Sequence, residues 1–367
     1  MLLYTLLIII ILSFIIIKIK YRFWSSQPIF HIYDIRYWLA PPGIIQRNIP
    51  KKTKFYDDNI EFHTIDKMTN IESGILYRFV KMHYDYLQNT TYRSSKQDFL
   101  RLYTHVSLQN SNKINSCLVS RPLECSIGKN NFVLSYLDLL CIRDEYKHRG
   151  LESRQIYTHY IKSRRICNYG IFLYKKQGNR GINVPLTTFN TYSVSAKDWN
   201  SPDKNIPVNI SVHIIQSSNC ELVLGFMKEL RNKFDCYIAP DYLQLVAMIN
   251  NGYIIPTVIL DNNTVVAITF FRNPNVSAKD GNIIECIGSY CREDYKEIFK
   301  TSFSNSVALI QKIFSFTSIR IENISYNYIL LKTILERSVP KGKDVTGYFL
   351  YNCAITPIFS PNAFIIN

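Results

Sequence analysis

The chain has 367 residues, of which 47% are hydrophobic and 19% are charged, which excludes the disordered class and indicates a globular protein. A chain of this length is expected to divide its core between two domains of roughly 150–180 residues. The formal net charge of +15 fits a polyanionic partner, but the basic residues are dispersed and no nucleic-acid-binding signature accompanies them, which argues against nucleic acid.

Nine cysteines are scattered along the chain without a Cys-x-x-Cys pair. An odd count with irregular spacing argues against both a disulfide framework and a zinc site. We therefore expect buried, reduced thiols and no metal.

The amino-terminal stretch is apolar, because residues 2–17 contain no charged side chain, and Lys18, Lys20 and Arg22 follow it. Its length is close to the ~20 residues that span a bilayer. A cleaved signal peptide would place positive charge before the apolar run, and basic residues after it favour a body on the cytoplasmic side. These features predict an uncleaved single-pass transmembrane anchor over residues 1–20, with the body of the protein in the cytoplasm.

The next segment, up to about residue 60, is rich in proline, which disfavours helix and interior strand. Apolar spacing then predicts elements in the following order. These are helices over 71–89 and 96–109, a loop over 110–131, a strand over 132–142, a helix over 151–166 and a strand over 170–175. The last three form a β-α-β unit.

A similar order recurs in the second part of the chain. The predicted elements are helices over 220–234 and 241–251, strands over 254–260, 264–271 and 283–290, a helix over 302–315, a strand over 317–322, a helix over 326–337 and a strand over 347–352. This repetition predicts a tandem duplication with its boundary near residues 195–210, and hence two halves at 21–200 and 201–367.

The loop that precedes the helix at 151–166 is basic and contains a glycine. A helix N-terminus exposes free backbone N–H groups and the positive end of the helix dipole, which together bind phosphate. Gly150 allows a close backbone approach, and Lys147 and Arg149 add charge. The loop suits the pyrophosphate of coenzyme A, although an ordinary solvated loop has the same composition.

Three separated stretches resemble the N-myristoyltransferase family. Residues 139–142 (L-L-C-I) and 146–151 (Y-K-H-R-G-L) resemble its F-L-C-V and L-R-S-K-R-L at the same spacing. Residues 21–29 resemble its Y-x-F-W-x-T-Q-P-V, and residues 349–352 resemble its Y-L-Y-N. The resemblance implies an α+β fold of two GNAT-like halves, each a mixed β-sheet flanked by helices. It also implies transfer of a myristoyl group from myristoyl-CoA to the N-terminal glycine of a peptide or protein, by a monomer and without a metal.

The resemblance further assigns roles to residues of this chain. The acyl-CoA site would comprise Tyr21, Arg22, Phe23, Trp24, Leu139, Leu140, Cys141, Ile142, Lys147, His148, Arg149, Gly150, Leu151 and Glu152. The backbone amides of Leu139 and Leu140 would form the oxyanion hole for the thioester. Tyr92, Thr187 and Tyr192 would contact the peptide.

In this family the base is the terminal carboxylate, which here belongs to Asn367. A base is needed because a glycine α-ammonium, with a pKa near ~8, is mostly protonated at neutral pH. The apolar tail at 363–366 favours burial, and desolvation would raise the pKa of the carboxylate and strengthen it as a base.

The chain also departs from the family pattern. Family members carry an acidic loop that contacts basic residues of the peptide, whereas residues 86–93 contain no acid. The membrane anchor is not a standard family feature either. Two alternatives therefore stay open: a GNAT-type acetyltransferase with a side-chain base such as Asp138 or Glu145, and an inactive membrane-anchored protein that binds acyl-CoA or peptide.

Overall fold

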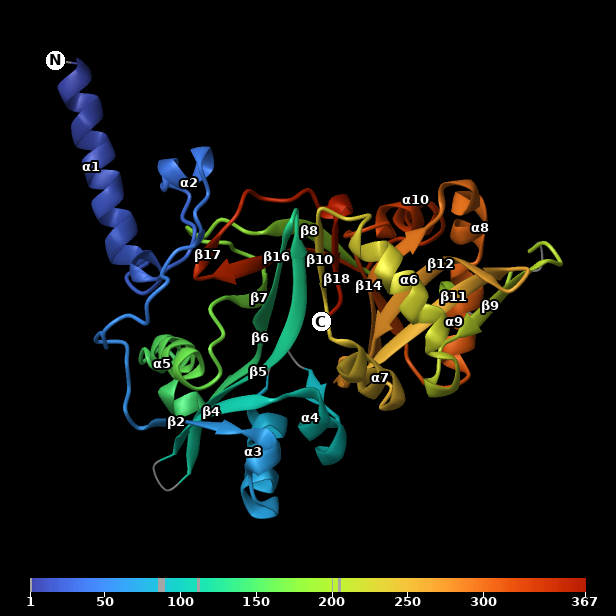
Figure 1. Cartoon of the computed structure of the whole chain (residues 1–367), viewed down its shortest axis with the longest axis horizontal. Coiled ribbons are helices and arrows are strands. Elements are labelled where there is room, and N and C mark those ends of the chain that lie inside the picture. The colour runs from blue at the N-terminus through green and yellow to red at the C-terminus, as the bar shows by residue number, and fades with distance from the viewer. Residues whose placement is uncertain (1, 85–89, 111–112, 200, 204–205) are drawn as a thin grey trace.

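The computed structural model describes residues 2–84, 90–110, 113–199, 201–203 and 206–367. Within these residues, one mixed sheet of 16 strands runs through the body and helices pack against it (Figure 1). The predicted α+β class is confirmed. All nine cysteines are free thiols, and eight of them are buried.

The first part of the chain forms the following elements. They are α1 (Leu2–Lys20), α2 (Ile35–Leu39), β1 (Gly43–Ile44), β2 (Ile60–Thr64), α3 (Asn70–His83), β3 (Thr91–Tyr92), α4 (Lys96–Leu102), β4 (His105–Asn110), β5 (Ile114–Ile127), β6 (Asn130–Ile142), α5 (Leu151–Ile166), β7 (Phe172–Gln177) and β8 (Thr187–Ser195).

The second part continues the series. It comprises β9 (Ile210–Ile214), α6 (Glu221–Arg231), β10 (Cys236–Ala239), α7 (Tyr242–Asn250), β11 (Ile254–Asp261), β12 (Thr264–Arg272), β13 (Val276–Ala278), β14 (Gly281–Cys291), α8 (Lys296–Thr301), α9 (Phe303–Gln311), β15 (Ser318–Glu322), α10 (Asn327–Arg337), β16 (Gly342–Tyr351), β17 (Cys353–Ala354) and β18 (Ala363–Ile365).

The two parts repeat one topology. Strands β2, β4, β5 and β6 pair antiparallel in turn, and β7 follows helix α5 and pairs parallel to β6. Strands β9, β11, β12 and β14 do the same, and β15 pairs parallel to β14 after α8 and α9. The next strand of each part pairs with the other part. Strand β8 of the first part pairs with β15 of the second, and β16 of the second part pairs with β7 of the first. The sheet is therefore continuous through both parts.

A long strand was missed by the sequence prediction. The predicted helix over 96–109 ends at Leu102, and the predicted loop over 110–131 is mostly strand β5. Strand β5 lies between β4 and β6, and two of its serines are buried and hydrogen-bonded: Ser116 donates to Gln155, and Ser120 bonds to His159. Buried serines at these positions removed the apolar pattern on which the strand prediction relied.

The amino-terminal helix α1 extends away from the body (Figure 1). It covers 19 residues and has Lys18 and Lys20 in its last turn. Among the residues that the structure describes, no helix combines the length and apolar character needed to cross a membrane. The transmembrane anchor expected over residues 1–20 is therefore not supported.

Candidate functional site

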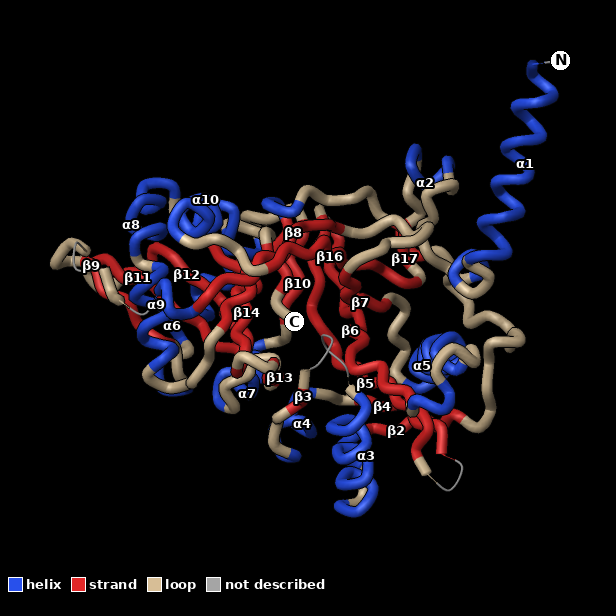
Figure 2. The backbone as a smooth tube through the Cα atoms, turned by 180° about the vertical axis from the view of Figure 1, so that it is seen from behind, coloured by secondary structure: helices blue, strands red, loops and turns tan. Residues whose placement is uncertain are grey.

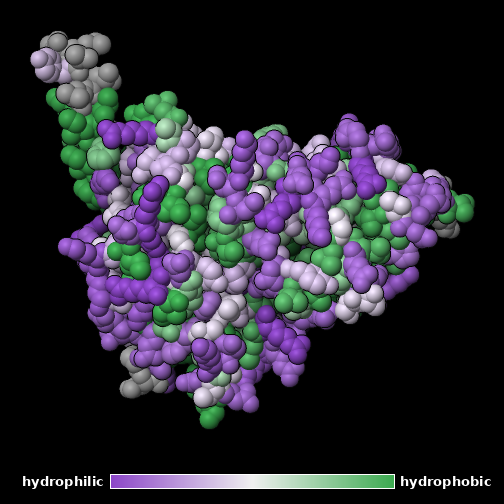
Figure 3. Space-filling view, in the orientation of Figure 1, coloured by the Kyte–Doolittle hydropathy of each residue, from purple (hydrophilic) through white to green (hydrophobic). Residues whose placement is uncertain are grey.

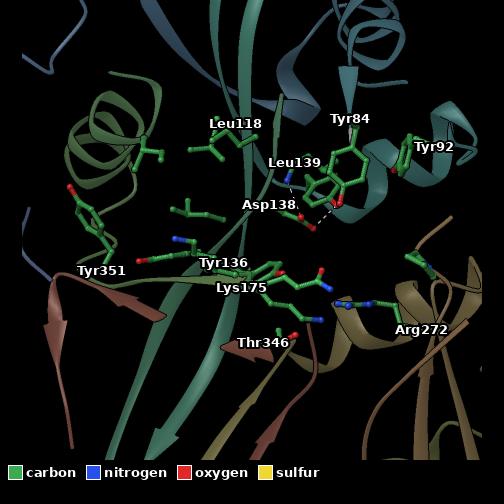
Figure 4. Close-up of a pocket in the computed structure, with 18 of the residues that line it drawn as sticks. Tyr84, Tyr92, Leu118, Tyr136, Asp138, Leu139, Lys175, Arg272, Thr346 and Tyr351 are labelled. Carbon is green, nitrogen blue, oxygen red and sulfur yellow. Dashed lines mark hydrogen bonds between the residues drawn. The ribbon is translucent and has the colours of Figure 1, made fainter. Parts of the chain in front are cut away.

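A cavity of about 380 Å³ opens beside the middle of the sheet (Figure 4). Both parts of the chain contribute to its lining. Its walls include seven tyrosines, a short aliphatic strip and four basic side chains; the basic ones are Lys175, Lys176, Arg272 and Arg320.

One wall of the cavity contains an irregular stretch of strand β6. Val119 of β5 pairs with Asp138 and Cys117 pairs with Cys141, so Leu139 and Leu140 together face the single residue Leu118. This two-against-one arrangement is a β-bulge. Leu139 has a φ of +48°, a conformation that is uncommon for a residue with a branched side chain. The bulge thus removes the backbones of both leucines from the regular pairing of β5 with β6. Both leucines line the cavity.

The carboxylate of Asp138 holds this bulge in place. Its Oδ1 accepts from the Leu139 N–H at 2.9 Å, and its Oδ2 accepts from the Tyr103 hydroxyl at 2.9 Å. Burial, together with the charge of Asp138, raises the pKa of Tyr103 well above its usual value, so this hydroxyl stays protonated as a donor. Figure 4 shows these contacts as dashed lines.

A buried guanidinium supports the tyrosines of the cavity. Arg121 is completely buried, and its guanidinium carbon lies 5.0, 5.1 and 5.5 Å from the ring centroids of Tyr103, Tyr136 and Tyr253. Stacking of a guanidinium on aromatic faces stabilises both when water is excluded. Because all three tyrosines line the cavity, Arg121 fixes the shape of that wall.

The carboxyl-terminal tail adds a strand to the edge of the sheet. Strand β18 pairs parallel with β10, and the Ile366 N–H donates to the Ile238 carbonyl at 2.8 Å. Every residue from 363 to 367 is fully buried, which confirms the predicted burial of the tail. In Figures 1 and 2 the C-terminus accordingly lies in the middle of the body.

Asn367 ends beside charged groups of the cavity. Arg272 Nη1 donates to the Asn367 backbone oxygen at 3.2 Å and to its Oδ1 at 2.8 Å, and the Tyr348 hydroxyl also donates to this Oδ1, at 3.0 Å. Arg272 forms an ion pair with Glu285, and Lys175 forms one with Glu322. The terminal residue is therefore held within a desolvated network of opposite charges.

The basic loop predicted to bind phosphate lies at the N-terminus of α5. His148 and Gly150 have positive φ values, and Gly150 is the residue immediately before the helix. Lys147, His148, Arg149 and Gly150 are exposed, whereas Leu151 is buried and anchors the first turn. Glu152 accepts from the His148 N–H at 3.2 Å, and Lys147 pairs with Asp144 at 2.7 Å. Like the buried Cys141 and Ile142 that precede it in β6, this loop lies outside the lining of the cavity.

Residues 21–24 lie at the base of α1, close to the cavity. The Trp24 ring lines the cavity and stacks on Tyr174, with centroids 5.8 Å apart. Phe23 is buried against Trp24 and Phe55. Tyr21 lies against Gly181, and Arg22 is exposed. Of this predicted set, Trp24 contributes to the lining.

Of the three residues expected to contact the peptide, one lines the cavity and two do not. Tyr92 lines the cavity. Thr187 and Tyr192, both on β8, do not, and Tyr192 lies under Lys343, whose Nζ is 5.7 Å from its ring centroid. Residues 85–89, on which most of the prediction about the missing acidic loop depends, are outside the described residues.

Several residues of the cavity were missed by sequence reasoning. They are Tyr103, Tyr136, Tyr253, Lys175, Arg272, Arg320 and Thr346, which come from separate strands and connections. One signal could have found two of them: Arg272 directly follows the strand predicted over 264–271, and Arg320 lies inside the strand predicted over 317–322. A charge in such a strand requires a partner, because burying it unpaired is costly.

No protein-family model and no curated protein sequence matches this chain. Its structure is nevertheless similar to solved structures of Saccharomyces cerevisiae N-myristoyltransferase. One of these, with bound myristoyl-CoA, is 12% identical, with a TM-score of 0.72 over 95% of this chain and 99% of that chain. A second, also with bound myristoyl-CoA, is 11% identical, with a TM-score of 0.71 over 94% of each chain. The chain therefore has the fold of these enzymes.

Proposed function

We propose that this chain is an acyltransferase that moves a myristoyl group, or a similar long acyl chain, from acyl-CoA to the N-terminal glycine amine of a protein. The observation that carries the proposal is the burial of Asn367 beside Arg272, which lines the same cavity as the Leu139–Leu140 bulge. A base and an oxyanion-binding backbone would thus meet at one cavity. The fold shared with the yeast enzyme supports the same reaction.

The proposed base is the terminal carboxylate of Asn367. It would take the proton from the glycine ammonium, and the free amine would then attack the thioester carbon. The carbon–sulfur bond breaks as the amide bond forms, and the second proton lost by the amine passes to the sulfur, so coenzyme A leaves as its thiol. Arg272 would hold the carboxylate in position through the Nη1 hydrogen bond.

The bulge in β6 would stabilise the oxyanion. The Leu139 N–H is engaged by Asp138 Oδ1 in this structure. If that amide donates to the thioester oxygen, the Asp138 carboxylate must release it when acyl-CoA binds. The amide of Leu140 would be the second donor.

The nucleotide end of acyl-CoA would lie on the basic loop. The N-terminus of α5, with Lys147 and Arg149 exposed beside it, would bind the phosphates. Trp24 would connect this region to the cavity, because its ring lies in the lining. The aliphatic and aromatic walls would receive the start of the acyl chain.

The decisive experiment compares two changes at the C-terminus. Asn367→Ala keeps a carboxylate at position 367, whereas one alanine added after Asn367 moves the carboxylate away. We expect transfer of labelled myristate from myristoyl-CoA to Gly-initiated peptides to persist in Asn367→Ala and to fall at least ~100-fold in the extended chain. Binding of myristoyl-CoA to both variants controls for folding.

The other outcomes separate the alternatives. Equal transfer by both variants would remove the terminal carboxylate from the mechanism and favour a side-chain base. Faster transfer from acetyl-CoA than from myristoyl-CoA would favour an acetyltransferase. Tight binding of myristoyl-CoA without turnover in the unmodified chain would identify an inactive binding protein.

A further inference from the structure

Exposed apolar side chains gather at the amino-terminal end of the molecule. On α1, residues 8–12 are 49–56% exposed, and on the neighbouring α2 Ile35 is 72%, Leu39 82% and Trp38 47% exposed. Figure 3 shows this hydrophobic surface on α1 and beside it, above a mostly polar body. Contiguous exposed apolar surface of this kind marks an interaction site.

The two helices are fixed to one another by the segment between them. The rings of Phe14 on α1 and Tyr33, just before α2, contact each other with centroids 5.4 Å apart. Lys18 Nζ lies 5.3 Å from the centroid of the same Tyr33 ring and donates to the Ser25 carbonyl at 2.9 Å. We refer to α1 and α2, together with Ser25 and Tyr33 between them, as the α1–α2 surface.

Positive charge lies at the base of the α1–α2 surface and on α2. Lys18, Lys20 and Arg22 lie at the base of α1, and Arg36 lies on α2. The acid within this segment, Asp34, accepts one hydrogen bond from the His31 backbone N–H and contacts the His31 ring at 3.0 Å. The surface therefore combines apolar side chains with a local excess of cations.

We propose that the α1–α2 surface binds an anionic lipid bilayer. The side chains of Ile35, Trp38 and Leu39 would enter the interface next to α1, and the surrounding cations would contact the lipid headgroups. Tryptophan is favoured at this depth, and each Lys or Arg near an anionic surface adds to the attraction. A second copy of the chain would present the same positive charge, which disfavours self-association through this surface. This inference does not depend on the proposed acyl transfer.

The test is flotation of the full chain with phosphatidylcholine vesicles, with and without phosphatidylserine. The key variant is Ile35→Asp/Leu39→Asp, and its matched control is Val208→Asp/Val339→Asp, which changes two exposed valines far along the chain. We expect the chain to bind vesicles that contain phosphatidylserine at least about tenfold more tightly than vesicles of phosphatidylcholine alone. Added salt should weaken this binding. The key variant should lose at least about fivefold in binding, and the control should not.

A second readout locates α2 in the lipid. Brominated phosphatidylcholine quenches tryptophan fluorescence at short range, and quenching should disappear in Trp38→Phe, because Trp199 is buried and Trp24 lies at the cavity. Three results would overturn the proposal. The first is equal binding to both kinds of vesicle, or no binding to either. The second is that Ile35→Asp/Leu39→Asp binds vesicles as well as the unmodified chain does. The third is self-association of the chain without lipid that is lost in this variant.

Discussion

Arg272 and Asn367 are joined by one guanidinium nitrogen that donates to both the backbone oxygen and the side-chain oxygen of the terminal residue. The two residues are 95 positions apart in the sequence, and both are buried. Because Arg272 is also paired with Glu285 on the neighbouring strand β14, the end of the chain is fixed to the centre of the sheet.

Replacing Arg272 should destabilise the fold strongly. Arg272→Met leaves Glu285 buried without its ion pair, which typically costs about 3–5 kcal/mol in the free energy of unfolding. Urea denaturation measures this loss, and the exposed substitution Lys332→Met is the control. The double variant Arg272→Met/Glu285→Met should recover part of the loss. If the losses of the two single variants simply added in the double variant, the two residues would not be coupled.

Asp138 distinguishes two mechanisms. Asp138→Asn keeps an oxygen that can accept from Tyr103 or Leu139 but removes the capacity to act as a base. With the terminal carboxylate as base, kcat for myristoyl transfer should change by less than about tenfold, whereas loss of a general base costs about 10²–10⁴-fold. Tyr103→Phe, which removes one donor to the same carboxylate, is the matched comparison. A collapse of kcat in Asp138→Asn alone would identify Asp138 as the base.

The basic loop before α5 should control affinity for the cofactor and not the chemical step. Lys147→Gln/Arg149→Gln is expected to raise KM for myristoyl-CoA at least about tenfold, because even one charged hydrogen bond to phosphate contributes on the order of 1.5–3 kcal/mol and every ~1.4 kcal/mol is tenfold. The value of kcat should be unchanged. Steady-state kinetics with Lys279→Gln/Lys332→Gln as a charge-matched control tests this expectation, and equal KM values in both double variants would contradict it.

Stability should fall in mild acid because of one buried histidine. His159 lies between the hydroxyls of Ser107 and Ser120, at 2.8 and 3.0 Å, and burial, with a smaller effect of His105, lowers its pKa from 6.5 to about 3. Between these two values the unfolded chain binds a proton that the folded chain does not. The free energy of unfolding therefore decreases as the pH falls through this window, by up to about 1.4 kcal/mol per pH unit.

Urea denaturation at pH 7, 6 and 5 measures this slope. His159→Gln, which can still bond to both serines, should flatten the pH dependence, whereas the exposed His213→Gln should leave it unchanged. Parallel curves for His159→Gln and the unmodified chain would exclude His159 as the source.

Local patterns were sufficient for much of the fold. Helix α5 has the predicted bounds, and α6, α7, β11, β12 and α10 lie within a few residues of their predicted positions. In these elements the apolar residues follow the period of the element, so the sequence carries the signal by itself. Strands β5, β8 and β10 were missed, because buried serines, threonines and short lengths hide the period that long-range pairing imposes.

The sequence by itself also determined the burial of the tail at 363–367, since so apolar a segment is disfavoured in water. Only the tertiary structure decided where that tail ends. The contact of Asn367 with Arg272 and the contact of Arg121 with Tyr253 each join residues that are distant in the chain. Such contacts depend on the register and order of strands in the sheet, which are set by pairing across the whole molecule and leave no local pattern in the sequence.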